Sequence, residues 1–215
     1  MKYELTSTSR IEGFSDGVFA IVITIMILEF RLPEQALDHG LWLGILRPSA
    51  PKILSYLLSF LILTNIWIGH HALMHSARYA TPALMWTNNN LLFWMSLVPF
   101  ATMVLGEHPL DASAVSLYGA SLAIVAASFS FLRWLVIREN NFHDQTYDIQ
   151  LGGLKRAIAS TLIYLAAIPA AFLSIYISLA LFVTSPIMFF IWHMGLTKRL
   201  LATRPEPGKK RTLRR

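Results

Sequence analysis

The sequence predicts an all-α integral membrane protein whose subunit crosses the bilayer with six helices. Hydrophobic residues make up 55% of the 215-residue chain and charged residues only 14%, and the mean hydropathy is +0.53. A spanning helix needs about 20 largely apolar residues. Six segments meet that requirement, at residues 13–30, 51–73, 84–106, 113–137, 155–172 and 174–195.

This composition excludes several other classes of protein. Apolar runs this long and numerous do not occur in a disordered chain, a coiled coil or a secreted disulfide scaffold. The chain has no Cys, so disulfides and thiolate metal sites are excluded as well. Only His and carboxylate side chains remain as candidate metal ligands.

The Lys and Arg residues are unevenly divided between the two sides of the predicted bundle. Of the 18 Lys and Arg, only Arg31, Arg47 and Lys52 lie on the side away from the two termini. Cytoplasmic loops carry an excess of Lys and Arg. We therefore expect a multi-pass protein of the plasma (inner) membrane, with both termini in the cytoplasm.

Three regions follow along the chain. We expect residues 1–12 to form a cytoplasmic N-terminus, residues 13–196 a six-helix transmembrane domain and residues 197–215 a basic cytoplasmic tail that ends GKKRTLRR. The net charge of +6 would suggest nucleic acid as the partner of a soluble protein. In a membrane protein such a tail favours anionic lipid headgroups, so we expect a lipid contact and no nucleic acid.

The first predicted helix starts at a capping box formed by Ser9 and Glu12, and it carries charge at membrane depth. Asp16 and Glu29 are separated by 12 residues, about 18 Å of helix, whereas the hydrocarbon core is about 30 Å thick. Either the bilayer thins here, or Asp16 and Arg10 lie at membrane depth facing protein or water. Ionisable groups at such depth are functional candidates. The alternative is a helix-end residue in the headgroup zone.

Farther along this helix, four residues form one stripe at helical spacing. They are Ile21, Thr24, Ile25 and Leu28. The stripe is apolar except for one hydroxyl, and its spacing alone favours an ordinary packing face. Arg10 and Asp16 lie about 240° apart around the helix, so they cannot pair along one face. We expect their partners on other helices.

The second and third segments offer such partners. Buried imidazole and amide groups need hydrogen-bond partners where there is no water, so we expect a polar cluster that joins Arg10, Ser15 and Asp16 to His and Asn side chains. The candidates are Trp67, His70, His71, His75, Asn88, Asn89 and Asn90. His71 and His75 also have the i, i+4 spacing of metal ligands. A metal site is therefore an alternative, although no obvious carboxylate accompanies the pair.

The start of the first helix resembles the signature of a known family. Arg10-x-x-x-Phe14-Ser15-Asp16, followed by GVFAIVITIMILE, is similar to the RxxxFSD signature of the endolysosomal potassium channel family, transmembrane protein 175, in its short prokaryotic branch. Two further stretches resemble the same family. They are Trp67-x-x-His70-His71 in the second helix and Asn90 leading to Pro99-Phe100 in the third.

The resemblance implies a homotetramer in which the first helix of each subunit lines a central pore. It implies an apolar constriction at Ile21, a role in potassium selectivity for Thr24 and a second apolar layer at Leu28, with Ile25 a further candidate for the lining. It also implies that the signature residues hold the pore helix through polar contacts and do not bind ions. This set is Arg10, Phe14, Ser15 and Asp16, with Trp67, His70, His71 and Asn90 as the matching partners.

The leading hypothesis is therefore a passive cation channel with a modest preference for potassium. Rings of Ile21 and Leu28 would close the pore by excluding water, and no TVGYG-like filter is present. Glu29 at the outer mouth would concentrate cations, or would only be a solvated charge at the interface. We expect no cofactor, metal or catalytic residue. A secondary transporter for a small cation is one rival, and an intramembrane enzyme with a His-bound metal is another.

Overall fold

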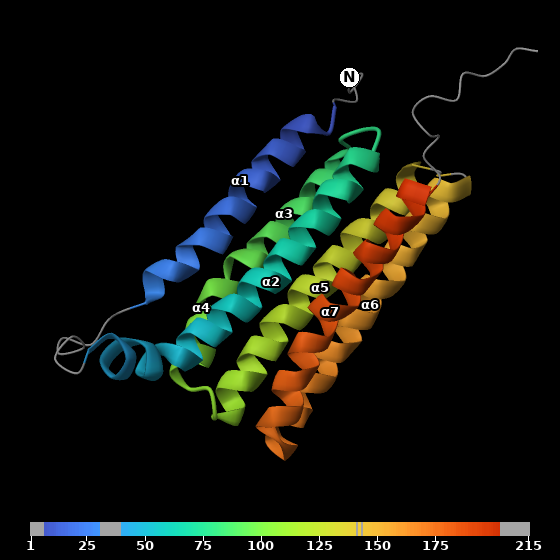
Figure 1. Cartoon of the computed structure of the whole chain (residues 1–215). Coiled ribbons are helices and arrows are strands. Elements are labelled where there is room, and N and C mark those ends of the chain that lie inside the picture. Colours follow the sequence, from blue (N-terminus) through green and yellow to red (C-terminus); the bar gives the residue numbers. More distant parts are fainter. Residues whose placement is uncertain (1–6, 31–39, 141, 143, 203–215) are drawn as a thin grey trace, which may run out of the picture.

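The structure, a computed structural model, is almost entirely helical (Figure 1). It describes residues 7–30, 40–140, 142 and 144–202. The elements are α1 (Ser9–Ile25), the 3₁₀ turn η1 (Met26–Glu29), the π-helical turn η3 (Leu41–Leu46), α2 (Arg47–Ser76), α3 (Pro82–Ser96), α4 (Val98–Glu107), α5 (Ala112–Asn140), α6 (Asp144–Leu173) and α7 (Ile175–Ala202). The basic tail predicted at residues 197–215 lies largely outside the described residues.

Six helical segments in the described part of the chain are long and apolar enough to cross a membrane, as the sequence predicts. They are Ser9–Leu28, Gly44–Ser76, Pro82–Glu107, Ala112–Asn140, Thr146–Leu173 and Ile175–Trp192. The third differs from the expectation because it is interrupted at Leu97, between α3 and α4. Pro99 lies in the first turn of α4, and a proline lacks the N–H that would continue the helical hydrogen-bond pattern.

The helices form two groups that share one core. α1 contacts α2, α3 and α4, whereas α5 packs mainly against α6, and α6 against α7. Figure 1 shows α1 along one edge of the bundle and α6 and α7 at the opposite edge. Contacts of α3 with α5 and of α2 with α7 join the two groups. The first helix is therefore a peripheral element of the subunit.

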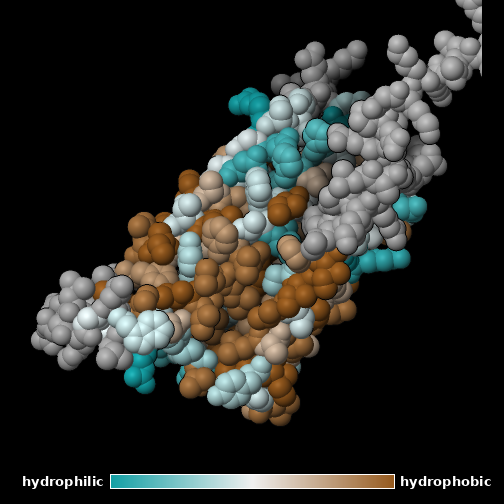
Figure 2. All heavy atoms as spheres, in the orientation of Figure 1, coloured by the Kyte–Doolittle hydropathy of each residue, from teal (hydrophilic) through white to brown (hydrophobic). Residues whose placement is uncertain are grey.

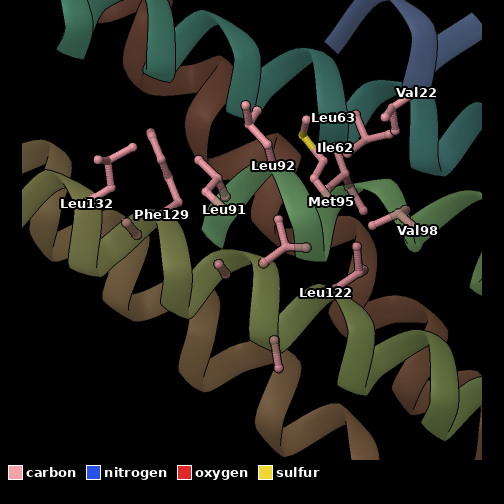
Figure 3. Close-up of a cluster of buried hydrophobic side chains, with 14 of the residues drawn as sticks. Val22, Ile62, Leu63, Leu91, Leu92, Met95, Val98, Leu122, Phe129 and Leu132 are labelled. Carbon is pink, nitrogen blue, oxygen red and sulfur yellow. The ribbon is translucent and has the colours of Figure 1, made fainter. Parts of the chain in front are cut away.

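The shared core consists of apolar side chains from all the helices. Figure 3 shows part of it, where residues of α1 to α5 meet. Leu63, Leu91 and Met95 are fully buried there. Lipid tails are as apolar as these side chains, so close packing and hydrogen bonds between helices hold such a bundle together. Ser59 of α2, for example, lies 2.7 Å from the Thr102 hydroxyl of α4 and 2.9 Å from the Tyr118 hydroxyl of α5.

A buried arginine also joins α5 to two other helices. Arg133 Nη1 donates to Gln150 Oε1 on α6 at 2.6 Å, and Nη2 donates to the Gly69 carbonyl on α2 at 3.1 Å. The guanidinium also lies over the Phe129 ring, 5.1 Å from its centroid, which is a favourable cation–π distance. Arg133 thus fixes the stretch of α2 that carries the neighbouring His70.

The helix starts show one difference from the sequence prediction. Asp111 caps α5 by accepting from the backbone N–H groups of the first turn, and these bonds hold the pKa of its carboxyl below the usual value. Thr81 caps α3 in the same way. The capping box predicted for Ser9 and Glu12 is wrong, because Glu12 N–H donates to the Thr8 carbonyl at 3.0 Å. The Glu12 carboxylate instead binds a histidine of α2.

The outer surface matches a membrane-spanning bundle. Figure 2 shows hydrophobic side chains across the middle of the visible face, with hydrophilic ones gathered toward the end of the bundle that holds the N-terminus. Large exposed hydrophobic residues are found on every spanning helix. A surface of this kind must be covered by lipid or by another protein.

Candidate functional site

Helix α1 has two distinct faces. One face is buried against α2, α3 and α4, through residues that recur every three or four positions. They are Ile11, Ser15, Phe19 and Val22, continued by Met26 in η1. The single polar residue among them, Ser15, has no exposed surface. This buried face therefore needs a hydrogen-bond partner for one hydroxyl.

The four residues of the predicted stripe lie on the opposite face of α1 and on η1, which carries Leu28. Ile21 is 63% exposed and Leu28 75% exposed in the subunit, and Thr24 and Ile25 are exposed as well. The packing-face interpretation, which the spacing alone favours, is therefore wrong for this subunit. The stripe contacts lipid, water or another copy of the chain. The side chain of Glu29, the predicted outer-mouth residue, lies outside the described residues.

Thr24 directs its hydroxyl proton into its own helix. Thr24 Oγ1 donates to the Ala20 carbonyl at 2.7 Å and lies 3.2 Å from the Ile21 carbonyl. A hydroxyl has one proton and two acceptor lone pairs. Because the proton points to the backbone, the oxygen presents its lone pairs away from the helix. This exposed apolar stripe thus carries one oxygen that can accept from water or contact a cation.

A chain of three buried side chains anchors the other face of α1. Asn88 Nδ2 on α3 donates to Ser15 Oγ at 2.9 Å, and Asn88 Oδ1 lies 2.8 Å from His70 Nε2 on α2. Because Asn88 Oδ1 can only accept, His70 Nε2 carries the proton of this bond. The Phe19 ring packs on His70, with 5.3 Å between the ring centroids. The amide of Asn88 on α3 therefore links Ser15 of α1 to His70 of α2.

Two further contacts tie the N-terminal half of α1 to α2 alone. Trp67 Nε1 donates to Asp16 Oδ1 at 2.9 Å, and His71 Nδ1 lies 3.0 Å from Glu12 Oε1. The Trp67, His71 and His75 rings follow one another along α2, with centroid distances of 6.1 and 6.4 Å. The acidic groups of α1 thus all face α2.

Three predicted site residues lie elsewhere. Arg10 forms no ion pair with a described residue, and it lines a groove of about 390 Å³ with Phe14, Asn88 and Asn89. Phe14 is 61% exposed. The prediction that Asn90 is a polar partner of the first helix is wrong for the subunit, because Asn90 Nδ2 donates to Ser128 Oγ on α5 at 3.2 Å. Arg10, Phe14 and Asn90 therefore do not join the hydrogen bonds that anchor α1.

Sequence reasoning did not single out Asn88 among the three consecutive asparagines. A signal was present, because Leu84, Leu91 and Met95 share a helix face with Asn88 and all are buried. In the described part of the chain, no three His, Asp or Glu side chains come together as a metal site. The paired His71 and His75 rings stack against each other without a third ligand there.

Known proteins are similar to this chain in sequence and in fold. The model of the endosomal/lysosomal potassium channel TMEM175 family matches residues 10–99, which span α1 to the start of α4. A potassium channel of Chryseobacterium sp. (strain P1-3) is 31% identical over 191 residues, which cover 89% of this chain and 96% of that protein. The chain belongs to the TMEM175 family. Its six apolar helices and this family make it a multi-pass membrane protein.

Two other members place the chain within the TMEM175 family. One is the crystal structure of a lysosomal potassium-selective channel TMEM175 homolog from Chamaesiphon minutus. It superposes on this chain with a TM-score of 0.74 and 29% identity, and the superposition covers 86% of this chain and 96% of the homolog. The human endosomal/lysosomal proton channel TMEM175 is 29% identical over 142 residues, which are 61% of this chain and 28% of the human protein. The family match includes all of the residues that anchor α1.

Proposed function

We propose that this TMEM175-family chain is a potassium channel that conducts passively through a central pore lined by α1. Potassium channels and potassium-selective structures among its relatives support this function. The observation that carries the pore assignment is the pair of faces on α1. One face is fixed by buried hydrogen bonds, and the other presents Ile21, Thr24 and Leu28 outward.

A pore of this kind requires several subunits. One peripheral helix cannot enclose an ion pathway, so copies of α1 must surround a shared axis. We propose a homotetramer in which the exposed stripe of each α1 faces that axis. The stripe would then leave lipid and line a narrow aqueous path.

Within this pore the stripe forms successive layers. At about 1.5 Å per residue of α-helix, Thr24 lies about 4.5 Å beyond Ile21. Leu28 lies about 7 Å beyond Thr24, because the 3₁₀ turn η1 rises about 2 Å per residue. Rings of Ile21 and Leu28 close the path by excluding water, and opening widens them. The outward lone pairs of Thr24 contact the ion between these rings. A single hydroxyl layer without a cage of backbone carbonyls gives modest selectivity for potassium over sodium.

The remaining parts of the proposal follow from the membrane setting. In this proposal the chain is a channel and not an enzyme. It needs no cofactor, and its ligand is the permeant potassium ion. Both termini lie in the cytoplasm of a cell with the channel in its inner membrane, and the basic tail contacts anionic headgroups. The N-terminus, residues 1–12, and the tail, residues 197–215, flank the six-helix channel domain of residues 13–196.

Ion flux into liposomes tests this function. The purified protein should admit potassium down its gradient, admit sodium more slowly, and do so without a gradient of any second ion. Flux that stops when a co-ion gradient is removed would instead indicate a secondary transporter. Empty liposomes prepared in parallel give the background. Absence of flux from protein that remains oligomeric would contradict the channel function.

A further inference from the structure

Two arginines of α5 and α6 carry positive charge into the bundle. Arg133 is only 6% exposed, and Arg156 is partly buried. Neither forms an ion pair with a carboxylate in the described part of the chain, and the two guanidinium groups are close enough to repel each other. Arg133 donates to neutral oxygens, those of Gln150 and the Gly69 backbone. Within the described residues the pair therefore lacks a counter-charge.

Each guanidinium group also keeps one N–H without an acceptor. The Nε atoms of Arg133 and Arg156 are both buried, and neither has a hydrogen-bond partner among the described residues. The Arg156 guanidinium lies over the Trp192 ring of α7, 3.4 Å from its centroid. A buried charged donor without an acceptor is costly. An acceptor that carries negative charge would meet both needs of this pair.

Two consecutive glycines of α6 bring the two charges together. A Cβ at Gly153 would lie 2.8 Å from Arg133 Cζ, and a Cβ at Gly152 would lie 3.4 Å from Arg156 Nη1. Both guanidinium groups therefore lie against the same turn of α6. A side chain at Gly153 would displace Arg133 from this turn, so the glycine is what admits the second charge.

The pair lies near one end of the spanning helices. α5 has 29 residues, about 43 Å of helix, and a bilayer with its headgroups is about 40–45 Å thick. Arg133 precedes the last residue of α5, Asn140, by seven positions, about 10 Å. Trp134 and Trp192 lie beside the two arginines, and tryptophans gather where membrane meets water. At this depth a long basic side chain reaches the headgroup layer.

The surface next to Arg156 suits a lipid molecule. Farther along α6, toward the middle of the membrane, Ile158, Leu162 and Leu165 are exposed at 44%, 61% and 48%. An apolar track of this kind, which begins at a basic residue, complements a molecule with an anionic head and hydrocarbon chains. Figure 1 shows α6 and α7 at the edge of the bundle opposite α1. This surface is therefore remote from the helix that lines the proposed pore.

We propose that Arg156 and Arg133 form a binding site for the phosphate group of an anionic phospholipid. Arg156, the more exposed of the two, donates to the phosphate oxygens in charge-assisted hydrogen bonds, and Arg133 adds its positive charge at the same turn of α6. The acyl chains lie along Ile158, Leu162 and Leu165. The site is separate from the basic tail and does not rest on the proposed pore, so its failure would leave the channel function standing.

Thermal unfolding of the full-length protein in detergent tests this site. Phosphatidylglycerol, phosphatidylcholine or inorganic phosphate is titrated into the parent, Arg156→Gln and Lys155→Gln. A ligand that binds only the folded protein raises the melting temperature. We expect phosphatidylglycerol to stabilise the parent more than phosphatidylcholine does. Arg156→Gln should need at least about tenfold more phosphatidylglycerol for the same rise, because it loses the charge-assisted hydrogen bonds.

Lys155→Gln is the matched control, since it removes the same charge from an exposed neighbouring residue, and it should respond as the parent does. An equal loss of response in both variants would show that only the overall charge matters, which contradicts the site. Inorganic phosphate that stabilises the parent as strongly as phosphatidylglycerol would assign the arginines to a free anion and overturn the lipid. A parent that phosphatidylglycerol does not stabilise would overturn the site itself.

A second variant keeps both charges. Gly152→Leu fills the space beside Arg156 Nη1, and it carries the test if Arg156→Gln does not yield folded protein. It should lose the same response to phosphatidylglycerol although the net charge is unchanged. A folded Gly152→Leu protein with the full response would contradict the placement of the phosphate beside Arg156.

Discussion

Ser15 and His70 lie on different helices and are joined by one amide, that of Asn88, through bonds of 2.9 and 2.8 Å. This connection sets the rotation of α1. With Ser15 turned toward α2 and α3, helical geometry turns Ile21, Thr24 and Leu28 to the opposite side. A buried hydrogen bond near one end of the helix therefore determines which residues the other end presents.

Asn88→Leu should destabilise the subunit, because it leaves Ser15 and His70 without their shared partner. Hydrogen bonds between membrane helices contribute about 0.6 kcal/mol on average and up to about 1.7 kcal/mol, so the loss of both should cost about 1–3 kcal/mol. Thr184→Val is the matched control, since the Thr184 hydroxyl is exposed and bonds its own helix. Thermal unfolding in detergent measures both. Equal melting temperatures for the two variants would show that the amide holds nothing in place.

Asp16→Ala should reduce the stability of the protein more than Asp16→Asn does. Asn retains an oxygen that can accept from Trp67 Nε1, whereas Ala leaves that donor unpaired. Trp67→Phe should lose a similar amount to Asp16→Ala, and the double variant little more than either single change. A double-mutant cycle measured by urea or thermal unfolding gives the coupling energy. Additive losses would show that the two side chains act independently.

Gly106→Ala should destabilise the contact between α2 and α4. A Cβ at this position would lie 2.7 Å from Ser55 Oγ and 3.0 Å from Lys52 Cα, so the backbones must move apart. Gly17→Ala is the matched change on α1, where a Cβ meets nothing within 4 Å in the subunit, and Ala gains about 1 kcal/mol of helix propensity. Melting temperatures should therefore change in opposite directions. A similar fall for both would mean that Gly17 is also closely packed.

Thr24→Val should lower the preference for potassium while preserving the shape of the stripe. Valine lacks the hydroxyl that donates to the Ala20 carbonyl and keeps its acceptor lone pairs free. Potassium and sodium flux in liposomes should become more nearly equal, with the tetramer intact. Thr161→Val, which removes a hydroxyl that bonds its own helix on α6, should leave the ratio unchanged. An unaltered ratio in Thr24→Val would remove this hydroxyl from the selectivity mechanism.

The sequence predicts the six spanning segments and the family correctly, because long apolar runs and a local signature are properties of the chain itself. It does not identify Asn88 over Asn90, since the choice depends on how α3 is rotated against α5. Helical spacing alone also favours a packing face for the stripe at Ile21, although the family resemblance places the stripe at a pore, and Ile21 is exposed in the subunit. A core, a lipid surface and a dewetted pore all select apolar side chains, so only the three-dimensional packing of α1 separates them. The roles of these residues in conduction remain predictions.

The most direct test of the pore assignment compares Ile21→Asn with Val22→Asn. These neighbours differ in burial, with Ile21 63% exposed and Val22 5% exposed in the subunit. An amide at Val22 is buried and should lower the yield of folded protein, whereas an amide at Ile21 should admit water to the constriction. Potassium and sodium flux per tetramer, measured in liposomes at matched protein content, should rise in Ile21→Asn with sodium less well excluded. A lower flux in Ile21→Asn with a reduced tetramer fraction would contradict the account and return Ile21 to a packing role.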